Sequence, residues 1–209
     1  MKKSIKLTVG ILIAIIMLVS ATKVVPIVWR GYNLYSNAVN ETSIEEKVEQ
    51  LKKYENYIYI EDVSAEFIDS MIKSEDKKFY KHNGFDLIST LRAAYQNLRS
   101  GKIVEGGSTI TQQLSKNLYF SFEKKYERKV AELIVAFKLE KRYSKDQILE
   151  YYLNIIYFGE GCYGIKEASL HYYGIQPIEL DESQAAALIR TLKSPNNYNP
   201  NRIKVATEG

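Results

Sequence analysis

The sequence contains few of the residues that build disulfide-linked or metal-binding proteins. Among 209 residues there is one cysteine, Cys162, and there are two histidines, His82 and His171. A single cysteine cannot form an internal disulfide, and neither histidine lies in an HExxH arrangement. The sequence therefore predicts no disulfide framework and no zinc site, and Cys162 is expected to be a buried structural thiol.

Acidic residues are absent from the first thirty positions, and this absence accounts for the net charge of +4. The basic residues there are Lys2, Lys3, Lys6, Lys23 and Arg30. Without them the chain is close to neutral. A nucleic-acid-binding protein is expected to carry its positive charge on the folded domain, so we expect no nucleic-acid partner.

An uncharged, mostly apolar run covers residues 7–22 and resumes after Lys23. Because Lys23 can place its ammonium group at an interface, the run extends through Val28 to the roughly 20 residues that span a bilayer. The lysines before it predict a cytoplasmic N-terminus, with Trp29 and Tyr32 at the outer interface. A cleaved signal peptide is the alternative, since residues 19–21 (VSA) fit a cleavage site. We favour an uncleaved anchor, and both interpretations place the folded part outside the cytoplasm.

The rest of the chain is predicted to form one largely helical domain, because no repeat, low-complexity tract or linker divides it. We expect a cytoplasmic tip and transmembrane anchor at 1–30, a stalk or linker at 31–56 and the domain at 57–209. Ile44, Val48 and Leu51 have helical spacing, which fits either a helical stalk or the start of the domain. Residues 57–60 (YIYI) fit either a short strand or an apolar link.

The segment EDKKFYKHNGFD, residues 75–86, places two adjacent carboxylates, Glu75 and Asp76, at the end of a predicted helix that begins at Ser64. A helix that ends in this way before a glycine-containing loop presents its carboxylates at a surface or cleft, as a general base requires. The alternative is a charged helix end above a loop packed by Phe79 and Tyr80. Apolar residues from Leu87 to Leu98 then predict a second helix that ends at Gly101.

The segment GGSTITQQLSKN, residues 106–117, combines two glycines with a dense set of hydrogen-bonding side chains. These are Ser108, Thr109, Thr111, Gln112 and Gln113. A helix that begins here would suit a phosphate at its N-terminus, although the spacing of a P-loop is absent. Lys116 lies one turn beyond Gln112 and can supply a cation. A glycine turn followed by a polar helix cap is the alternative.

Residues 124–143 form a third predicted helix, in which Val130, Leu133, Ile134 and Phe137 mark the expected buried stripe. Arg128 and Glu132 are spaced i,i+4 on another face. They fit either a weak surface ion pair or a carboxylate held in a cation cluster of Lys116, Arg128 and Lys129 that neutralises an anionic leaving group.

Five segments together resemble the family-51 glycosyltransferases, the peptidoglycan transglycosylase domains of class A penicillin-binding proteins and of monofunctional peptidoglycan glycosyltransferases. They are EDKKFYKHNGFD, GGSTITQQLSKN, RKVAE, ILEYYLNIIYFGEGCYGI and SPNNYNP, in the family's order over about residues 60–200. The resemblance implies a mostly α-helical, lysozyme-like fold with a larger lobe, a smaller membrane-proximal jaw and a cleft between them. The transmembrane helix predicted from the apolar run would precede this domain.

The resemblance also implies a reaction and a site. The family polymerises lipid II into β-1,4-linked glycan strands with release of undecaprenyl diphosphate, and we expect an inverting single displacement. The matching catalytic residues are Glu75, the general base on the acceptor 4-hydroxyl, and Glu132, which assists near the departing diphosphate. The matching substrate-binding and supporting residues are Asp76, Phe79, His82, Ser108, Thr109, Gln112, Gln113, Lys116, Asn117, Arg128 and Lys129.

The remaining expectations follow from the same resemblance. No cofactor is required, while a divalent cation, Mg²⁺ or Mn²⁺, is left open. The expected partners are lipid II, the growing lipid-linked glycan, the bacterial cytoplasmic membrane, transpeptidases and other cell-wall synthesis proteins. The domain would lie on the outer face of that membrane, in a single-pass, monofunctional protein. A lytic transglycosylase or muramidase, and an inactive membrane-anchored scaffold, are the alternatives; the cation cluster disfavours the first and the two glutamates disfavour the second.

Overall fold

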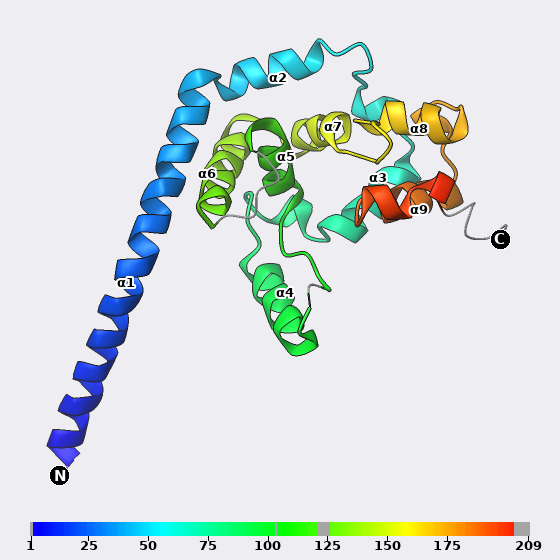
Figure 1. Cartoon of the computed structure of the whole chain (residues 1–209). Coiled ribbons are helices and arrows are strands. Elements are labelled where there is room, and N and C mark those ends of the chain that lie inside the picture. Colours follow the sequence, from blue (N-terminus) through cyan, green and yellow to red (C-terminus); the bar gives the residue numbers. More distant parts are fainter. Residues whose placement is uncertain (1, 103, 121–125, 203–209) are drawn as a thin grey trace.

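The structure, a computed structural model, describes the backbone of residues 2–102, 104–120 and 126–202, and side chains from residue 20 onward within those ranges. It is mostly helical, as the sequence predicts (Figure 1). The α-helices are α1 (Lys2–Glu41), α2 (Ile44–Lys52), α3 (Ala65–Glu75), α4 (Leu87–Ser100), α5 (Ile110–Tyr119), α6 (Tyr126–Arg142), α7 (Lys145–Ile155), α8 (Ile165–Tyr173), α9 (Glu182–Thr191) and α10 (Pro195–Tyr198). Short 3₁₀ turns lie at η1 (Ile60–Asp62), η2 (Phe79–Lys81) and η3 (Pro177–Glu179).

The core of the predicted membrane anchor, residues 7–19, has side chains outside the described range. From residue 20 onward, where side chains are described, none of the helices has the length and apolar character needed to cross a bilayer. The described part of α1 exposes several apolar and aromatic side chains, among them Val25, Val28 and Trp29.

Helix α2 packs into the core of the folded unit, which favours the second interpretation of this segment, the start of the domain, over a stalk. Ile44, Val48 and Leu51 are 1–2% exposed and belong to the main hydrophobic cluster. The Ser43 hydroxyl and the Glu46 carboxylate cap the helix reciprocally. Helix α2 is therefore part of the folded unit, and Tyr35 and Val39 at the end of α1 also pack against its core.

The segment at 57–60 is a link and not a strand. Its Ile58 backbone N–H donates to the Asn154 side-chain oxygen at 2.8 Å, and the Asn154 amide donates back to the Ile58 carbonyl, also at 2.8 Å. A side chain of α7 therefore satisfies the backbone groups that a neighbouring strand would otherwise pair.

Helix α1 crosses α6 at a glycine. A Cβ atom added at Gly31 would lie 2.5 Å from the Val130 Cβ atom and 2.7 Å from the Glu127 carbonyl oxygen. The Arg30 guanidinium lies 3.6 Å from the Glu127 carboxylate beside this crossing. The absence of a side chain at Gly31 therefore lets α1 lie directly against the first turns of α6.

This crossing explains why the predicted buried stripe of α6 is wrong. Val130, Leu133 and Ile134 are only partly buried, and Phe137 is exposed. The fully buried face carries Ala131, Glu132, Val135, Ala136 and Leu139. Small side chains face the core because α5 and α7 also pack against α6 there.

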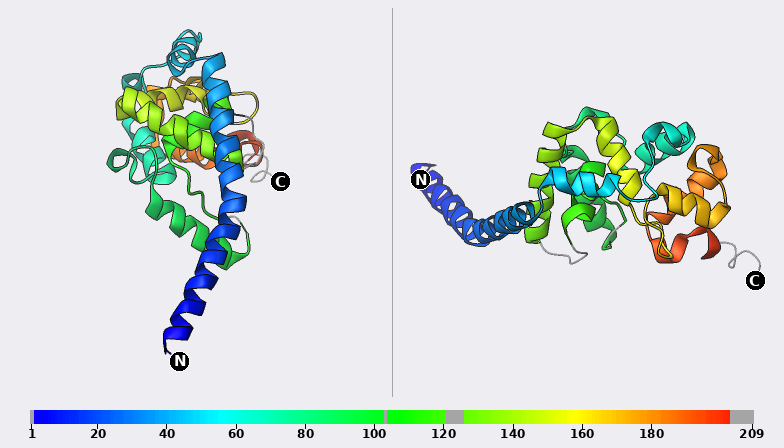
Figure 2. Two further views of the ribbon diagram at one scale, coloured as in Figure 1. Left: turned by 90° about the vertical axis from the view of Figure 1, so that its left-hand side faces the viewer. Right: turned by 90° about the horizontal axis from the view of Figure 1, so that it is seen from above.

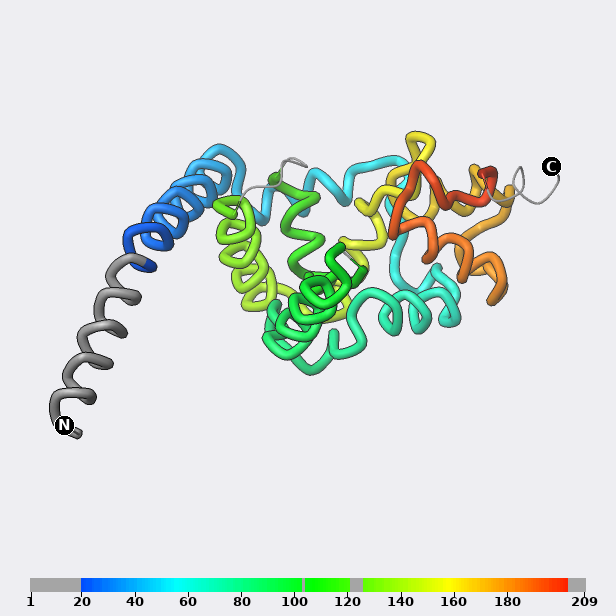
Figure 3. Tube along the Cα trace, turned by 60° about the horizontal axis from the view of Figure 1, so that its bottom comes forward, coloured from blue at the N-terminus to red at the C-terminus, as the bar shows by residue number. Residues whose placement is uncertain are grey.

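Helix α4 forms as predicted, with Asp86 as its N-cap and Gly101 in the left-handed region at φ 66°. Its apolar face, however, is exposed: Leu91, Tyr95 and Leu98 have exposed fractions of 61–84%. Figures 1 and 2 show α4 projecting from the body of the domain. Figure 3 shows α5 and α6 side by side, and α3 running towards α9, which it contacts.

Candidate active site

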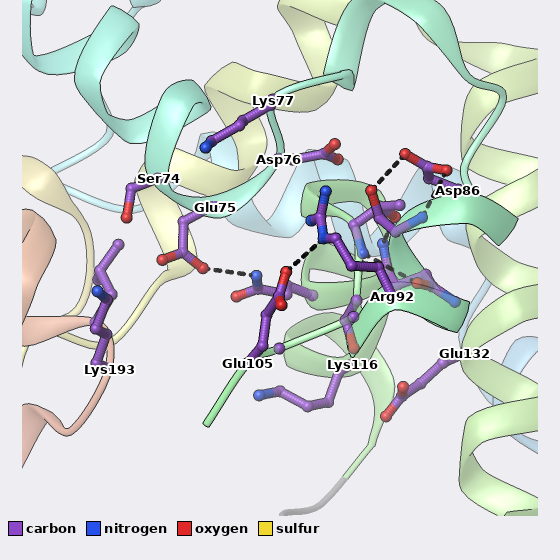
Figure 4. Close-up of a pocket in the computed structure, with 18 of the residues that line it drawn as sticks. Ser74, Glu75, Asp76, Lys77, Asp86, Arg92, Glu105, Lys116, Glu132 and Lys193 are labelled. Atoms are coloured by element: carbon purple, nitrogen blue, oxygen red, sulfur yellow. Dashed lines mark hydrogen bonds and ion pairs between the residues drawn. The ribbon is translucent and has the colours of Figure 1, made fainter. Parts of the chain in front are cut away.

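A cleft of about 810 Å³ is formed where α3, α4, α5 and α6 converge, and the segment just after α9 closes one side. Figure 4 shows Glu75 on one side of the cleft and Glu132 on the other, with the Lys116 side chain between them in that view. Residues far apart in the sequence, including the two predicted catalytic glutamates, therefore line one cavity.

Glu75 is the last residue of α3, a helix capped by Ser64 as predicted. Its carboxylate accepts a hydrogen bond from the side-chain Nε2 of Gln113 on α5 at 2.9 Å. The Gln113 Oε1 atom accepts in turn from the hydroxyl of Tyr152 on α7 at 3.0 Å. The helix end thus presents its carboxylate to the cleft, and α5 holds that carboxylate in place.

Asp76, Phe79 and His82 hold the loop that follows Glu75. The Asp76 carboxylate is 2.8 Å from the His82 Nε2 atom and also accepts from the Ile110 backbone N–H at 3.1 Å. Because His82 Nδ1 accepts from the Gly84 N–H, its Nε2–H donates to Asp76. Phe79 is fully buried. Asp76 borders the cleft, whereas Phe79 and His82 lie outside its lining and support it.

The start of α5 uses several of its polar side chains internally. Thr109 and Gln112 form the predicted helix cap, and the Thr109 hydroxyl also donates to the Gly84 carbonyl at 2.8 Å. Thr111 is fully buried and donates to Glu140 on α6 at 2.6 Å. Ser108, Thr109, Gln112 and Gln113 line the cleft, while Asn117 does not. The structure therefore combines both interpretations of this segment: a capped helix start that also borders the site.

The surface ion pair suggested as one alternative for Arg128 and Glu132 is wrong, because Glu132 is buried at 1% exposure. Its two carboxylate oxygens lie 2.9 Å from Arg128 and 2.9 Å from Lys129, and Lys129 also donates to the Ser108 hydroxyl at 2.8 Å. The Arg128 contact satisfies the distance of an ion pair, but among the described residues neither Arg128 Nε nor Glu132 Oε1 has an aligned hydrogen-bond partner. The buried centre of this cluster therefore contains two polar atoms whose hydrogen bonding is incomplete.

Lys116 contributes a partly desolvated cation to the same cleft. Burial lowers the pKa of Lys116, the nearby Glu132 carboxylate opposes that shift, and Arg128 and Lys129 add to it. Lys116 and Lys129 line the cleft beside Glu132, and Arg128, which pairs with Glu132 but does not line the cleft, adds a third positive charge. This end of the cleft is therefore suited to an anion.

The structure also places in the cleft residues that the sequence did not single out. Lys193 and Ser74 lie on the Glu75 side (Figure 4). Arg92 on α4 donates to Glu105 at 2.8 Å, and both line the opening. Lys193 directly precedes the SPNNYNP segment, and this position beside a family motif is the sequence signal that could have identified it as a cleft residue. The Arg92–Glu105 pair spans a loop, and nothing in the spacing indicates it.

Within the described ranges, no group of three or more His, Cys, Asp or Glu side chains is arranged to hold a metal ion. The cleft carboxylates instead pair with cations or accept hydrogen bonds from neighbouring side chains and backbone groups. Cys162 is buried, as predicted, and burial raises its pKa to about 11.

Comparison with known proteins gives consistent matches. A family model described as transglycosylase matches residues 41–208. The chain belongs to the transglycosylase family. The motif resemblance is thereby confirmed, and with it, at the level of the family, the predicted peptidoglycan glycosyltransferase class of enzyme.

Individual relatives of this transglycosylase differ in length. The chain is 39% identical over 177 residues to the biosynthetic peptidoglycan transglycosylase of Nitrosospira multiformis, covering 83% of this chain and 77% of that protein. It is 39% identical to a monofunctional glycosyltransferase of Staphylococcus epidermidis, over 74% of this chain and 61% of the relative. It is 44% identical to penicillin-binding protein 1F of Bacillus subtilis, over 68% of this chain but only 20% of that protein. The chain thus spans about a fifth of the length of such penicillin-binding proteins.

Proposed function

We propose that this transglycosylase polymerises lipid II into β-1,4-linked glycan strands and releases undecaprenyl diphosphate. The observation that carries the proposal is the arrangement of the cleft. A carboxylate at a helix end, Glu75, lies on one side, and a buried carboxylate surrounded by Lys116, Arg128 and Lys129 lies on the other. This pairing of a base with an anion-binding cluster suits transfer of a sugar from a diphosphate.

Glu75 is the proposed general base. It would accept the proton of the acceptor 4-hydroxyl as that oxygen forms a bond to C1 of the donor sugar, while the bond from C1 to the diphosphate oxygen breaks. A single displacement of this kind inverts the α-linked donor into a β-linked product. The hydrogen bond from Gln113 supports this role because it fixes the carboxylate through one of its two oxygens.

The cation cluster is the proposed site of the departing diphosphate. Negative charge develops there as the bond breaks, and preorganised cations stabilise it without reorganisation. Glu132 would hold Arg128 and Lys129 in register rather than act on the sugar, since it is buried between them. We expect no required cofactor, and polymerisation with and without a chelator tests whether Mg²⁺ or Mn²⁺ contributes.

Both lipid-linked substrates require a site at a bilayer surface, and two features support this placement. The apolar face of α4 is exposed. Helix α4 and the N-terminal part of α1 also extend from the domain toward the same side (Figures 1 and 2). We infer that α4 is the membrane-proximal jaw and that α1 carries a single-pass anchor with its N-terminus inside. The domain then lies on the outer face of the bacterial cytoplasmic membrane, near transpeptidases that act on its product.

Labelled lipid II and purified protein in detergent test the proposal. We expect a ladder of lipid-linked polymer from the wild type and none from Glu75→Gln. Glu179→Gln, an exposed carboxylate outside the cleft, is the matched control and should polymerise normally. Degradation of preformed glycan instead of polymerisation would favour the glycan-cleaving alternative, and inactivity of the wild type in both assays would favour a scaffold.

A further inference from the structure

Tyr152 lies beneath the cleft and is completely buried, yet it does not line the cavity. From α7 its hydroxyl donates to Gln113 Oε1 at 3.0 Å, and Gln113 Nε2 donates to the Glu75 carboxylate at 2.9 Å. The resulting chain of hydrogen bonds links three helices and ends at the proposed base.

We propose that Tyr152 is a positioning residue for the transfer reaction and acts through Gln113 to hold the Glu75 carboxylate in its productive orientation. The inference rests on the proposed function, because it gives Glu75 the role of base. Tyr152 itself touches neither substrate nor reacting atoms.

The amide of Gln113 explains why a hydroxyl is needed. The two ends of an amide have nearly the same shape but opposite hydrogen-bonding character. An ionised carboxylate only accepts, so the NH₂ group has to face Glu75, and Oε1 then faces Tyr152. A donor at that second position reinforces this orientation. Without it, Oε1 loses its hydrogen bond and only the contact with the carboxylate orients the amide, so Gln113 holds Glu75 less firmly.

Tyrosine is suited to this task at working pH. Burial raises the pKa of Tyr152 well above its ordinary value, and the negative charges of Glu75 and Asp76 add to that effect. The hydroxyl therefore keeps its proton and remains a donor. Because the chain is anchored on helices rather than loops, it holds the carboxylate with little freedom.

Tyr152→Phe removes only the hydroxyl and is the primary test. We expect kcat for polymerisation to fall about tenfold, equivalent to about 1.4 kcal/mol in the barrier, with little change in the KM for lipid II. Tyr172→Phe is the matched control. Tyr172 lies on α8, outside the cleft, and this change also removes one buried hydroxyl, which donates to the Phe158 carbonyl at 2.9 Å. The Tm of Tyr172→Phe should fall about as far as the Tm of Tyr152→Phe, but its kcat should be unchanged.

A double-mutant cycle separates positioning from general destabilisation. Gln113→Leu, at a half-buried position, should lower kcat at least as much as Tyr152→Phe, and adding Tyr152→Phe to it should cause no further loss. Additive losses, equal losses in the Tyr172→Phe control, or a normal kcat for Tyr152→Phe would overturn the inference. If Tyr152→Phe does not fold, a normal kcat for Gln113→Leu overturns it as well.

Glu75→Gln distinguishes the two levels of the argument. If that variant polymerises like the wild type, the proposed base is wrong. If it is inactive while Tyr152→Phe has a normal kcat, the base stands and only the positioning role of Tyr152 is wrong.

Discussion

The crossing of α1 and α6 at Gly31 gives a sharp prediction, because helix propensity and packing have opposite effects there. Glycine is a poor residue inside a helix, so Gly31→Val should stabilise α1 by a few tenths of a kcal/mol on propensity alone. The structure leaves no space for that side chain. Even its Cβ atom would lie 2.5 Å from Val130 Cβ and 2.7 Å from a backbone oxygen.

Neither neighbour is the end of a flexible side chain, so α1 has to move away from α6. Overpacking of this kind costs about 1–3 kcal/mol, which exceeds the gain in propensity. We expect a net loss of about 2 kcal/mol, corresponding to a fall of about 4–8 °C in Tm for a chain of this size. Asn37→Val, at an exposed position of the same helix, should leave Tm nearly unchanged.

Thermal unfolding of the full chain in detergent, followed by far-UV circular dichroism, measures both variants. Polymerisation assays on Gly31→Val should also show a loss, because α6 carries Arg128, Lys129 and Glu132. An unchanged or higher Tm for Gly31→Val than for Asn37→Val would refute the close crossing of the two helices.

Three further outcomes are expected. Phe79→Ala should lower the free energy of unfolding by about 3–5 kcal/mol, measured by urea denaturation, because Phe79 is fully buried; a loss below 1 kcal/mol would contradict its packing. Lys116→Met should abolish polymerisation but raise Tm at pH 7. Burial lowers the pKa of Lys116, so at any pH below its ordinary pKa of 10.5 the charged side chain opposes folding. A lower Tm for the variant would contradict this desolvation. The hydrogen bonds from Ser89 lower the pKa of the Asp86 carboxyl. The ionised carboxylate should therefore stabilise the fold at pH values above its ordinary pKa of 3.8, and this stabilisation should be lost as the pH falls below that value. Asp86→Ala should lower Tm at pH 7 and weaken the dependence of Tm on acid pH, and an unchanged melting profile would contradict the role of Asp86 as a helix cap.

Local signals in the sequence predicted the helix boundaries well. Ser64 caps α3, Gly101 ends α4, and the polar cap expected in residues 106–117 is that of Thr109 at the start of α5. The segments at Glu75 and at Gln113 were predicted to form one site, and the structure places both in one cleft. The helix caps depend on residues within one turn of each other, so the sequence carries them directly. The joining of the two distant segments in one site was implied by the family resemblance.

Predictions that depended on which neighbour covers a helix were less successful. The apolar stripe of α6 pointed to Val130 and Phe137, but the core lies on the side of Ala131 and Val135, because α1 covers only part of the first face. The α4 pattern indicates an amphipathic helix but not what its apolar face meets. Likewise, i,i+4 spacing could not reveal that Glu132 is buried, since burial depends on how α5 and α7 pack.

If α1 carries the proposed anchor, its contact with α6 also sets the height of the site above the bilayer. Arg30 pairs with Glu127 one residue before Arg128, so α1 leaves the domain at the level of the first turn of α6. With a rise of about 1.5 Å per residue, Arg128 to Glu132 spans only about 6 Å along the helix axis. If Trp29 marks the outer interface, the cation cluster lies at the depth of lipid headgroups. A diphosphate carried on a lipid would then meet its cations without leaving the membrane surface, and glycan remote from the membrane would lie beyond reach.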